Sequence, residues 1–306
     1  MLRSVILAAA RNGRVKDLVA TAPLSRSVVR RYVAGESVDD AVRVTYGLTA
    51  GGLRVSLDHL GEDTTEPAQA AATAKAYITL LQRLGDDGLT GGAEVSVKLS
   101  AVGQMLDERM ALEHAREVCA AAERVGTTVT LDMEAHTTTD STLRVLRELR
   151  ADFPTTGAVL QAYLHRTEDD CRELAHAGSR VRLCKGAYQE PAEVAYQSRA
   201  EVDRSYVRCL NVLMAGEGYP MVATHDPRLI AIADERARWH GRKKGSYEFQ
   251  MLYGVRPDEQ RRLVAGGETV RVYLPYGTQW YGYLMRRLAE RPANLTFFLR
   301  SLVSTR

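Results

Sequence analysis

Residues 94–99, Glu-Val-Ser-Val-Lys-Leu, form a short apolar run with a lysine near its end. Seven other runs along the 306-residue chain share this plan, and most are separated from the next by a helix-like stretch. The eight runs, whose starts lie 22 to 41 residues apart, are 53–57, 94–99, 128–133, 158–163, 180–183, 219–223, 247–251 and 269–274. Because parallel strands buried on both faces produce apolar segments of this kind, the pattern predicts an α/β fold, a (βα)8 TIM barrel.

Polar side chains suited to ligand chemistry stand at or just after the ends of these runs. In a parallel barrel the carboxyl ends of all strands meet at one face, and that face carries the chemistry. The residues expected there are Glu62, Lys98, Asp132, Gln161, Arg182, Lys185, Thr224, His225, Gln250 and Tyr273. A ring of this composition predicts an active site.

Composition places the chain among ordinary globular proteins. Apolar residues make up 45% of it, and the net charge of +3 comes from basic residues scattered among acids, which argues against nucleic-acid binding. The four cysteines form no CxxC pair, so we expect a reducing, cytoplasmic compartment. The apolar segment 5–10 is shorter than a signal-peptide core, and no apolar stretch is long enough to span a membrane.

Residues 1–50 are helical in character and precede the first strand, so we expect an N-terminal helical extension packed on a barrel of residues 51–306, together one structural unit. Within it, Ser37-Val-Asp-Asp40 resembles a capped helix start. Barrel helices are expected at 64–84, 104–126, 139–151, 167–178, 191–216, 226–240 and 257–266. We expect the basic turn Gly241-Arg-Lys-Lys-Gly245 to be solvated.

The last segment with chemistry, from Thr278 to Glu290, predicts a helix capped by Thr278. One edge of that helix can present Tyr283, Arg286 and Arg287 together. Paired guanidinium groups bind carboxylates in a bidentate manner, and the position after the eighth strand favours this role. The alternative is a solvated arginine pair that stabilises the helix end.

Lys98 stands in the middle of an apolar strand, where its ammonium needs a partner or a polar cavity unless the side chain reaches the surface. Asp132 on the neighbouring strand is a natural counter-charge, and the pair would keep Lys98 protonated to assist in binding a carboxylate. Arg182 and Lys185, followed by Gly186, suit a pyrophosphate or a reduced, anionic flavin.

The common metal and dinucleotide signatures are absent from the sequence. The seven histidines show no HxH or HExxH spacing, so no metal is expected, and His225 is predicted to be a hydrogen-bonding residue rather than a base. Neither a GxGxxG turn nor a Walker loop occurs. Any flavin must therefore be held by strand ends and nearby helices.

Six segments, taken together and in order, resemble the monofunctional bacterial proline dehydrogenases, flavin-dependent enzymes of proline catabolism. They are Val97-Lys-Leu-Ser, Leu131-Asp-Met-Glu, Leu160-Gln-Ala-Tyr-Leu, Arg182-Leu-Cys-Lys-Gly-Ala-Tyr, Ala223-Thr-His-Asp and Tyr283-Leu-Met-Arg-Arg-Leu. The resemblance spans nearly the whole chain, from Arg30 onward. It implies a distorted (βα)8 barrel whose eighth helix lies over the barrel mouth, and oxidation of L-proline to Δ1-pyrroline-5-carboxylate by hydride transfer from ring C5 to N5 of FAD.

The resemblance also implies roles for individual residues. Arg286, Arg287 and Lys98 would clamp the proline carboxylate, and Asp132 would orient Lys98. The other substrate positions would be Tyr273 and Tyr283 around the ring, Ala187, Tyr188 and Leu183 in the pocket, and Glu62 as a gate that pairs with the first arginine. The FAD contacts would be Gln161, Arg182, Lys185, Gly186, Thr224, His225 and Glu290.

Two departures from the larger bifunctional relatives place the chain closer to the single-function branch. Gln189 stands where those relatives commonly have a tryptophan, and the connection 277–283 is shorter. The resemblance further implies that electrons pass to a membrane quinone, with peripheral contact at the inner face of the cell membrane. Because an aldehyde dehydrogenase domain is absent, the product would pass to a separate pyrroline-5-carboxylate dehydrogenase.

Two other functional classes stay open. A barrel aldolase would use Lys98 as a Schiff-base lysine, which borohydride would trap with a carbonyl substrate. A non-catalytic proline or flavin sensor would bind ligand on the same barrel but leave the flavin oxidised when proline is added.

Overall fold

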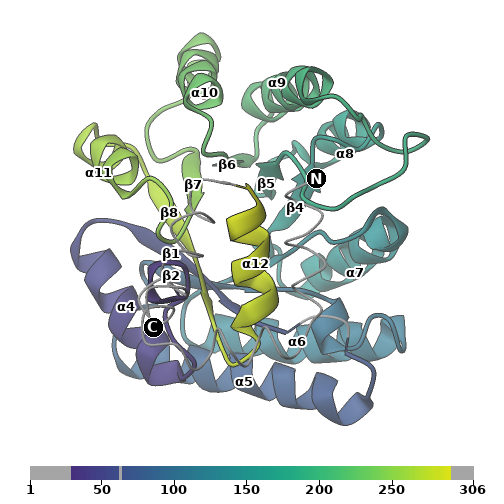
Figure 1. The fold of residues 1–306 in the computed structure, drawn as a ribbon, viewed down its shortest axis with the longest axis vertical. Helices are drawn as coiled ribbons and strands as arrows, with labels where there is room; N and C mark the ends of the chain where they lie inside the picture. The colour runs from purple at the N-terminus through teal and green to yellow at the C-terminus, as the bar shows by residue number, and fades with distance from the viewer. Residues whose placement is uncertain (1–28, 62–63, 291–306) are drawn as a thin grey trace, which may run out of the picture.

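Eight parallel strands form a nearly closed barrel with helices around it, which confirms the fold class (Figure 1). The computed structural model describes residues 29–61 and 64–290, and of 286–290 it describes the backbone alone. The strands are β1 Arg54–His59, β2 Ala93–Val97, β3 Val129–Leu131, β4 Ala158–Gln161, β5 Arg180–Cys184, β6 Tyr219–Ala223, β7 Glu248–Leu252 and β8 Val270–Tyr276. They correspond to the eight predicted runs.

The strand order is β3-β2-β1-β8-β7-β6-β5-β4, and the paired neighbours are parallel. The seam between β3 and β4 is held by Gly157, which lies just before β4. Its carbonyl accepts from the backbone N–H of Leu131 (2.9 Å), and its own N–H donates to the carbonyl of Val129 (2.8 Å). A short bridge thus joins β3 to β4 in place of a full ladder, and the barrel is nearly closed.

Helices lie around the barrel and, in one case, over its mouth, with labels as in Figure 1. They are α4 Val38–Ala50, α5 Pro67–Asp86, α6 Glu108–Arg124, α7 Thr139–Asp152, α8 Thr167–Leu174, α9 Arg199–Ala215, α10 Pro227–Trp239, α11 Pro257–Ala265 and α12 Trp280–Glu290. In the described part of the chain no helix combines the length and apolar character needed to cross a bilayer.

Capping residues explain where two of these helices begin. Ser37 and Asp40 form a capping box at α4, as the sequence predicts. The helix expected at 191–216 is shorter, because Ser198 and Glu201 form a capping box that starts α9 at Arg199. The final helix α12 begins at Trp280, so Gln279 rather than Thr278 immediately precedes it.

The strands are apolar on one face only. The barrel was predicted correctly, but the assumption that its strands are apolar on both faces was wrong. Alternate residues facing the helices are apolar and buried, among them Val55, Leu57, Val95, Val97, Val181, Leu183, Phe249, Val270 and Val272. The residues between them are polar and bond to one another across the barrel, as in the contact between Arg182 of β5 and Ser56 of β1. The barrel interior is therefore largely polar, with Val159 and Met221 as apolar members.

Helix α12 lies across the mouth of the barrel, in front of the strands in the view of Figure 1. Its start is fixed by Trp280, whose indole N–H donates to Glu36 (2.8 Å). Nearby, the N–H of Ala34 donates to Pro275 and that of Gly277 to Gly35, both at 2.9 Å, which ties the segment before α4 to the end of β8. The division at residue 50 stays a prediction, since residues 1–28 lie outside the described chain.

Candidate active site

Lys98 lies just after β2 and is almost fully enclosed, with 8% of its surface exposed, so the alternative of surface exposure is excluded. Its ammonium donates to both carboxylate oxygens of Asp58, at 2.7 and 2.6 Å, and to the hydroxyl of Tyr273 at 3.3 Å. Asp132, the counter-charge expected from the sequence, lies 3.9 Å away. The short ion pair of Lys98 is thus made with Asp58, a residue that the sequence did not single out.

Tyr273 links this pair to a second one. Its hydroxyl donates to Asp132 (2.7 Å), and the other oxygen of Asp132 accepts from Arg182 (2.7 Å) and from the hydroxyl of Ser96 (2.8 Å). The guanidinium of Arg182 also lies over the Tyr273 ring, 5.4 Å from its centroid. Residues in or just after five strands, β1, β2, β3, β5 and β8, therefore contribute to one network at the carboxyl ends of the barrel strands.

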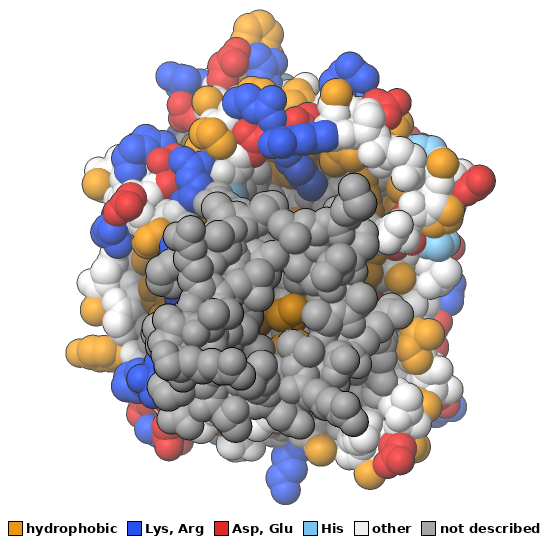
Figure 2. Space-filling view, in the orientation of Figure 1, with side chains coloured by type: hydrophobic (Ala, Val, Ile, Leu, Met, Phe, Trp, Pro, Cys, Tyr) orange, Lys and Arg blue, Asp and Glu red, His pale blue; other side chains and the backbone are white. Residues whose placement is uncertain are grey.

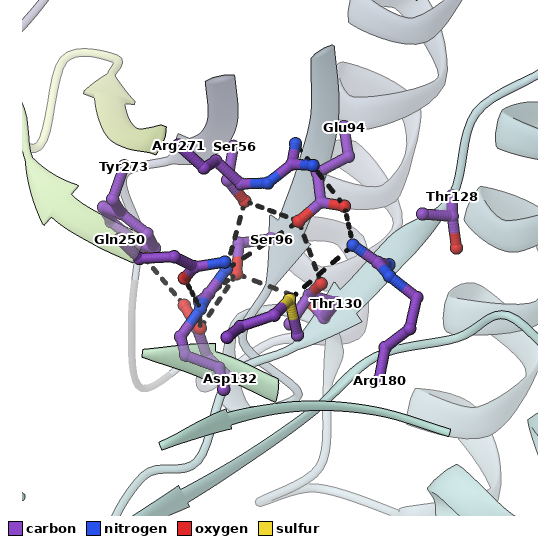
Figure 3. Close-up of polar contacts among 12 residues, drawn as sticks. Ser56, Glu94, Ser96, Thr128, Thr130, Asp132, Arg180, Gln250, Arg271 and Tyr273 are labelled. Atoms are coloured by element: carbon purple, nitrogen blue, oxygen red, sulfur yellow. Dashed lines mark hydrogen bonds and ion pairs between the residues drawn. The ribbon is translucent and has the colours of Figure 1, made fainter. Parts of the chain in front are cut away.

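Gln250 joins this network to a second layer deeper in the barrel. Its carbonyl accepts from Arg182 (2.5 Å), and its amide donates to Glu248 (2.6 Å). Glu248 in turn accepts from Arg271 (2.7 Å). The far end of the layer is Glu94, which binds Arg180 and lies close to Arg271 (Figure 3).

Burial and charge set the protonation of these groups. Burial raises the pKa of Asp58, and the ammonium of Lys98 opposes that rise. For Glu94 the three surrounding guanidinium groups outweigh burial and lower the pKa to about 2. Burial, with the charges of Asp132 and Asp58, raises the pKa of Tyr273 well above its usual value, so its hydroxyl remains a donor at neutral pH.

The rim formed by β4, β5 and β6 carries the residues expected to hold a flavin. The amide nitrogen of Gln161 donates to the carbonyl of Glu134 (2.7 Å), and Lys185 binds Asp203 (2.5 Å) and Asp226 (3.2 Å). The hydroxyl of Thr224 accepts from the N–H of Asp226 (3.1 Å). These contacts fix the side chains within the protein.

His225 has the structural role predicted for it. Its Nε2 accepts a hydrogen bond from the backbone N–H of Leu252 (2.9 Å), so in the neutral ring the proton resides on Nδ1. Its carbonyl accepts from Arg256 (2.7 Å). The imidazole therefore joins the ends of β6 and β7.

The loop after β5 is anchored from two neighbouring loops. The N–H of Tyr163 donates to the carbonyl of Lys185 (2.9 Å), and its hydroxyl donates to the buried Glu190 (3.3 Å). His136, after β3, binds the same carboxylate through its ring and its backbone N–H. Gly186 lies between these anchors with φ of +105°.

Comparison with known proteins adds evidence of a different kind. The family model described as proline dehydrogenase matches residues 41–300. The chain belongs to the proline dehydrogenase family.

Whole-length relatives support this assignment. Proline dehydrogenase from Deinococcus radiodurans is 39% identical over 308 residues, which cover 99% of this chain and 98% of that protein. Proline dehydrogenase 1 from Bacillus subtilis is 36% identical over 303 residues, 99% of each chain. A crystal structure of proline utilization A (PutA) from Bdellovibrio bacteriovorus has a TM-score of 0.82 at 24% identity; the match covers 99% of this chain and 40% of that one, and it supports the fold.

The remaining predicted positions of this proline dehydrogenase family member lie in different surroundings. Tyr283 is buried, whereas Ala187 and Tyr188 are exposed on the loop after β5. Leu183 lies in the apolar layer between strands and helices. Glu62 lies outside the described residues, and for Arg286, Arg287 and Glu290 only the backbone of α12 is described.

Among the described residues of the proline dehydrogenase chain, no cluster of His, Cys, Asp or Glu is suited to a metal ion. Several members of the polar network escaped prediction, namely Asp58, Glu94, Ser96, Glu248 and Arg271. The signal that could have revealed them is the period of two: Ser56 and Asp58, Glu94 and Ser96, and Glu248 and Gln250 alternate with apolar residues.

Proposed function

We propose that this chain is an FAD-dependent L-proline dehydrogenase that produces Δ1-pyrroline-5-carboxylate and passes the electrons to a quinone. The observation that carries the proposal is the cluster of the buried Lys98 and Asp132 with the half-buried Tyr273 at the barrel mouth, beneath the helix that bears Arg286 and Arg287. A cation beside a tyrosine ring suits a small substrate that has both a carboxylate and an apolar ring.

The rim residues fit a flavin by their chemistry. The polar edge of an isoalloxazine offers carbonyl acceptors and one N–H donor. Arg182 and Lys185 are cationic donors, and Thr224 can donate through its hydroxyl. Gln161 uses its amide nitrogen on Glu134, which leaves its carbonyl oxygen as the end to accept from a ligand. Bound FAD supplies the redox chemistry, as acceptor at N5 of a hydride from ring C5 of proline.

The protein's own contribution is to bind and orient proline. Lys98, Arg286 and Arg287 hold the carboxylate, and the guanidinium groups add bidentate geometry that fixes the direction of the ring. Tyr273 and Tyr283 pack against the ring, with Ala187 and Tyr188 at its edge and Glu62 as the gate. Holding C5 in a reactive position can contribute several kcal/mol to catalysis.

The proton of the substrate amine is left to solvent. Asp58 and Asp132, the carboxylates that the described chain brings to Lys98, are committed to Lys98, Tyr273 and Arg182. Neither carboxylate is therefore available as a base to accept the proton of the substrate amine. The same commitment disfavours the aldolase alternative, because a Schiff-base lysine must react as the neutral amine, and the two oxygens of Asp58 favour the ammonium.

Downstream of the flavin, we propose a membrane quinone as acceptor at the inner face of the cell membrane, and a separate pyrroline-5-carboxylate dehydrogenase for the product. The described rim facing the viewer in Figure 2 carries basic and acidic side chains interspersed, so any contact with the membrane there would be transient rather than a strong attachment to anionic lipid.

A visible spectrum of the purified protein tests the proposal. We expect flavin absorption, and its loss when L-proline is added without oxygen. A quinone added next should restore the absorption. A colourless protein that is trapped by borohydride with a carbonyl substrate would support the aldolase, and a yellow protein that proline leaves oxidised would support the sensor.

A further inference from the structure

We propose that Asp58 is a positioning residue that keeps Lys98 charged and directed at the substrate carboxylate. The inference rests on the proposed function, since it concerns the same site. It assigns to β1 a part in substrate binding that the sequence motifs did not indicate.

The geometry around Lys98 supports this assignment. Asp58 is 1% exposed, and its two oxygens occupy two of the three N–H directions of the ammonium, at 2.6 and 2.7 Å. The third direction includes the Tyr273 hydroxyl, at 3.3 Å. The charged and titratable groups that the described chain brings to this place are Asp58 and His59 from β1, Tyr77 from α5, Asp132 after β3, Arg182 from β5, and Tyr273 and Tyr276 from β8.

Asp58 is itself held in place from two sides. Residue 58 pairs with Ser96 in the β1–β2 register, so its side chain and that of Lys98, two residues beyond Ser96, lie on the same face. The hydroxyl of Tyr77 from α5 donates to the carbonyl of Ser96 (2.8 Å) and lies 3.4 Å from Asp58. The carboxylate therefore approaches Lys98 from a fixed direction.

Asp132 cannot take over this task. One of its oxygens accepts from Arg182 and Ser96, and the other accepts from Tyr273. Asp132 thus neutralises Arg182, and Asp58 neutralises Lys98. Without Asp58 a buried ammonium would lose its short counter-charge, and burial would favour its neutral form at a lower pH.

Binding of cyclopentanecarboxylate to the flavin-loaded protein, measured by calorimetry from pH 6 to pH 10, tests the inference. This ligand lacks the amine of proline, the arginines stay charged in this range, and Tyr273 stays protonated, so a loss of binding at high pH reports on Lys98. We expect the wild type to retain affinity to higher pH than Asp58→Asn. The pH of half-maximal affinity should fall by at least about one unit in the variant.

Two variants make the result specific. Asp170→Asn removes another buried, ion-paired carboxylate, on α8 outside the barrel interior, and should keep the wild-type profile. Lys98→Met should bind weakly, with an affinity that is about the same at every pH. If the profile of Asp58→Asn matches that of the wild type, the inference is wrong while the proposed function stands; if the wild type binds no cyclopentanecarboxylate at any pH, both are wrong.

A measurement on the wild type, with Lys98→Met used only to assign the signal, covers the case in which Asp58→Asn does not fold. The chain contains six lysines, so the ¹⁵N signal of the Lys98 side chain can be assigned by its loss in Lys98→Met. We expect that nitrogen to remain an ammonium at pH 9. A neutral amine at pH 8 would overturn the inference.

Discussion

In the loop after β5, Gly186 is a position where a side chain cannot be added without strain. With φ at +105°, a Cβ there would also lie 2.4 Å from the Tyr163 ring. We expect Gly186→Ala to lower the free energy of unfolding by roughly 2–4 kcal/mol, from backbone strain and overpacking together. The variant should also retain less flavin, because the loop carries Lys185. Urea denaturation and the ratio of flavin to protein absorbance measure both effects.

Gly178→Ala is the matched control. Gly178 also has positive φ (+79°), but its Cβ would meet no atom within 4 Å. Gly178→Ala should lower the free energy of unfolding through backbone strain alone, by about 1–2 kcal/mol, and should leave the flavin content unchanged. Equal losses in the two variants would show that contact with Tyr163 is unimportant.

At the scale of elements, Arg242 holds the end of α9. The turn that contains it was expected to be solvated, yet its guanidinium donates to the carbonyls of Leu213 (3.0 Å), Met214 (2.9 Å) and Gly216 (2.5 Å). The terminal carbonyls of a helix lack hydrogen-bond donors within the helix. At the end of α9 the guanidinium of Arg242, from a later turn, is the donor. The expectation of a solvated turn is wrong for Arg242, although its neighbours Lys243 and Lys244 are exposed.

We expect Arg242→Lys to lower the free energy of unfolding by about 1.5–3 kcal/mol. A lysine keeps the charge but cannot reach several carbonyls at once, so buried acceptors lose their partners. Lys243→Met, in the same turn, should change stability by less than about 0.5 kcal/mol. Thermal and urea unfolding would distinguish them, and an equally mild effect of both changes would contradict the capping role.

The same scale shows what could be predicted from the sequence. The strands were predictable because apolar residues facing the helices recur along each run, and the start of α4 because Ser37 carries a local capping signal. The same signal at Ser198 was present but not used, so the helix there was expected to start at 191. The contacts between side chains in the barrel interior were not predictable, because the partners are distant in sequence. Arg182, for example, contacts Ser56 across 126 positions. Lys98 was therefore recognised as a cation in need of a partner, while Asp58 was missed.

At the scale of the whole molecule, the described barrel interior is balanced in charge. Four acidic residues, Asp58, Glu94, Asp132 and Glu248, contact four basic residues, Lys98, Arg180, Arg182 and Arg271. A charge removed from water destabilises the folded state unless it is paired. The loss of one member therefore leaves its partner as an unpaired buried charge and lowers the free energy of unfolding. Because the interior contains these charged groups, the free energy of unfolding depends on pH. A barrel with an apolar interior would lack this dependence.

Glu94 sets the direction of that dependence. Its pKa is lowered from 4.5 to about 2 in the folded protein, so the stability that it contributes is complete above pH 4.5 and is lost as the pH falls towards 2. We expect Glu94→Gln to be less stable than the wild type at pH 7 by roughly 3–5 kcal/mol, and to lose less stability between pH 4.5 and 2.5. Urea denaturation at several pH values measures the two slopes. Glu235→Gln, an exposed carboxylate on α10, should reproduce the wild-type slope, and a Glu94→Gln slope as steep as the wild type's would assign the acid sensitivity to other carboxylates.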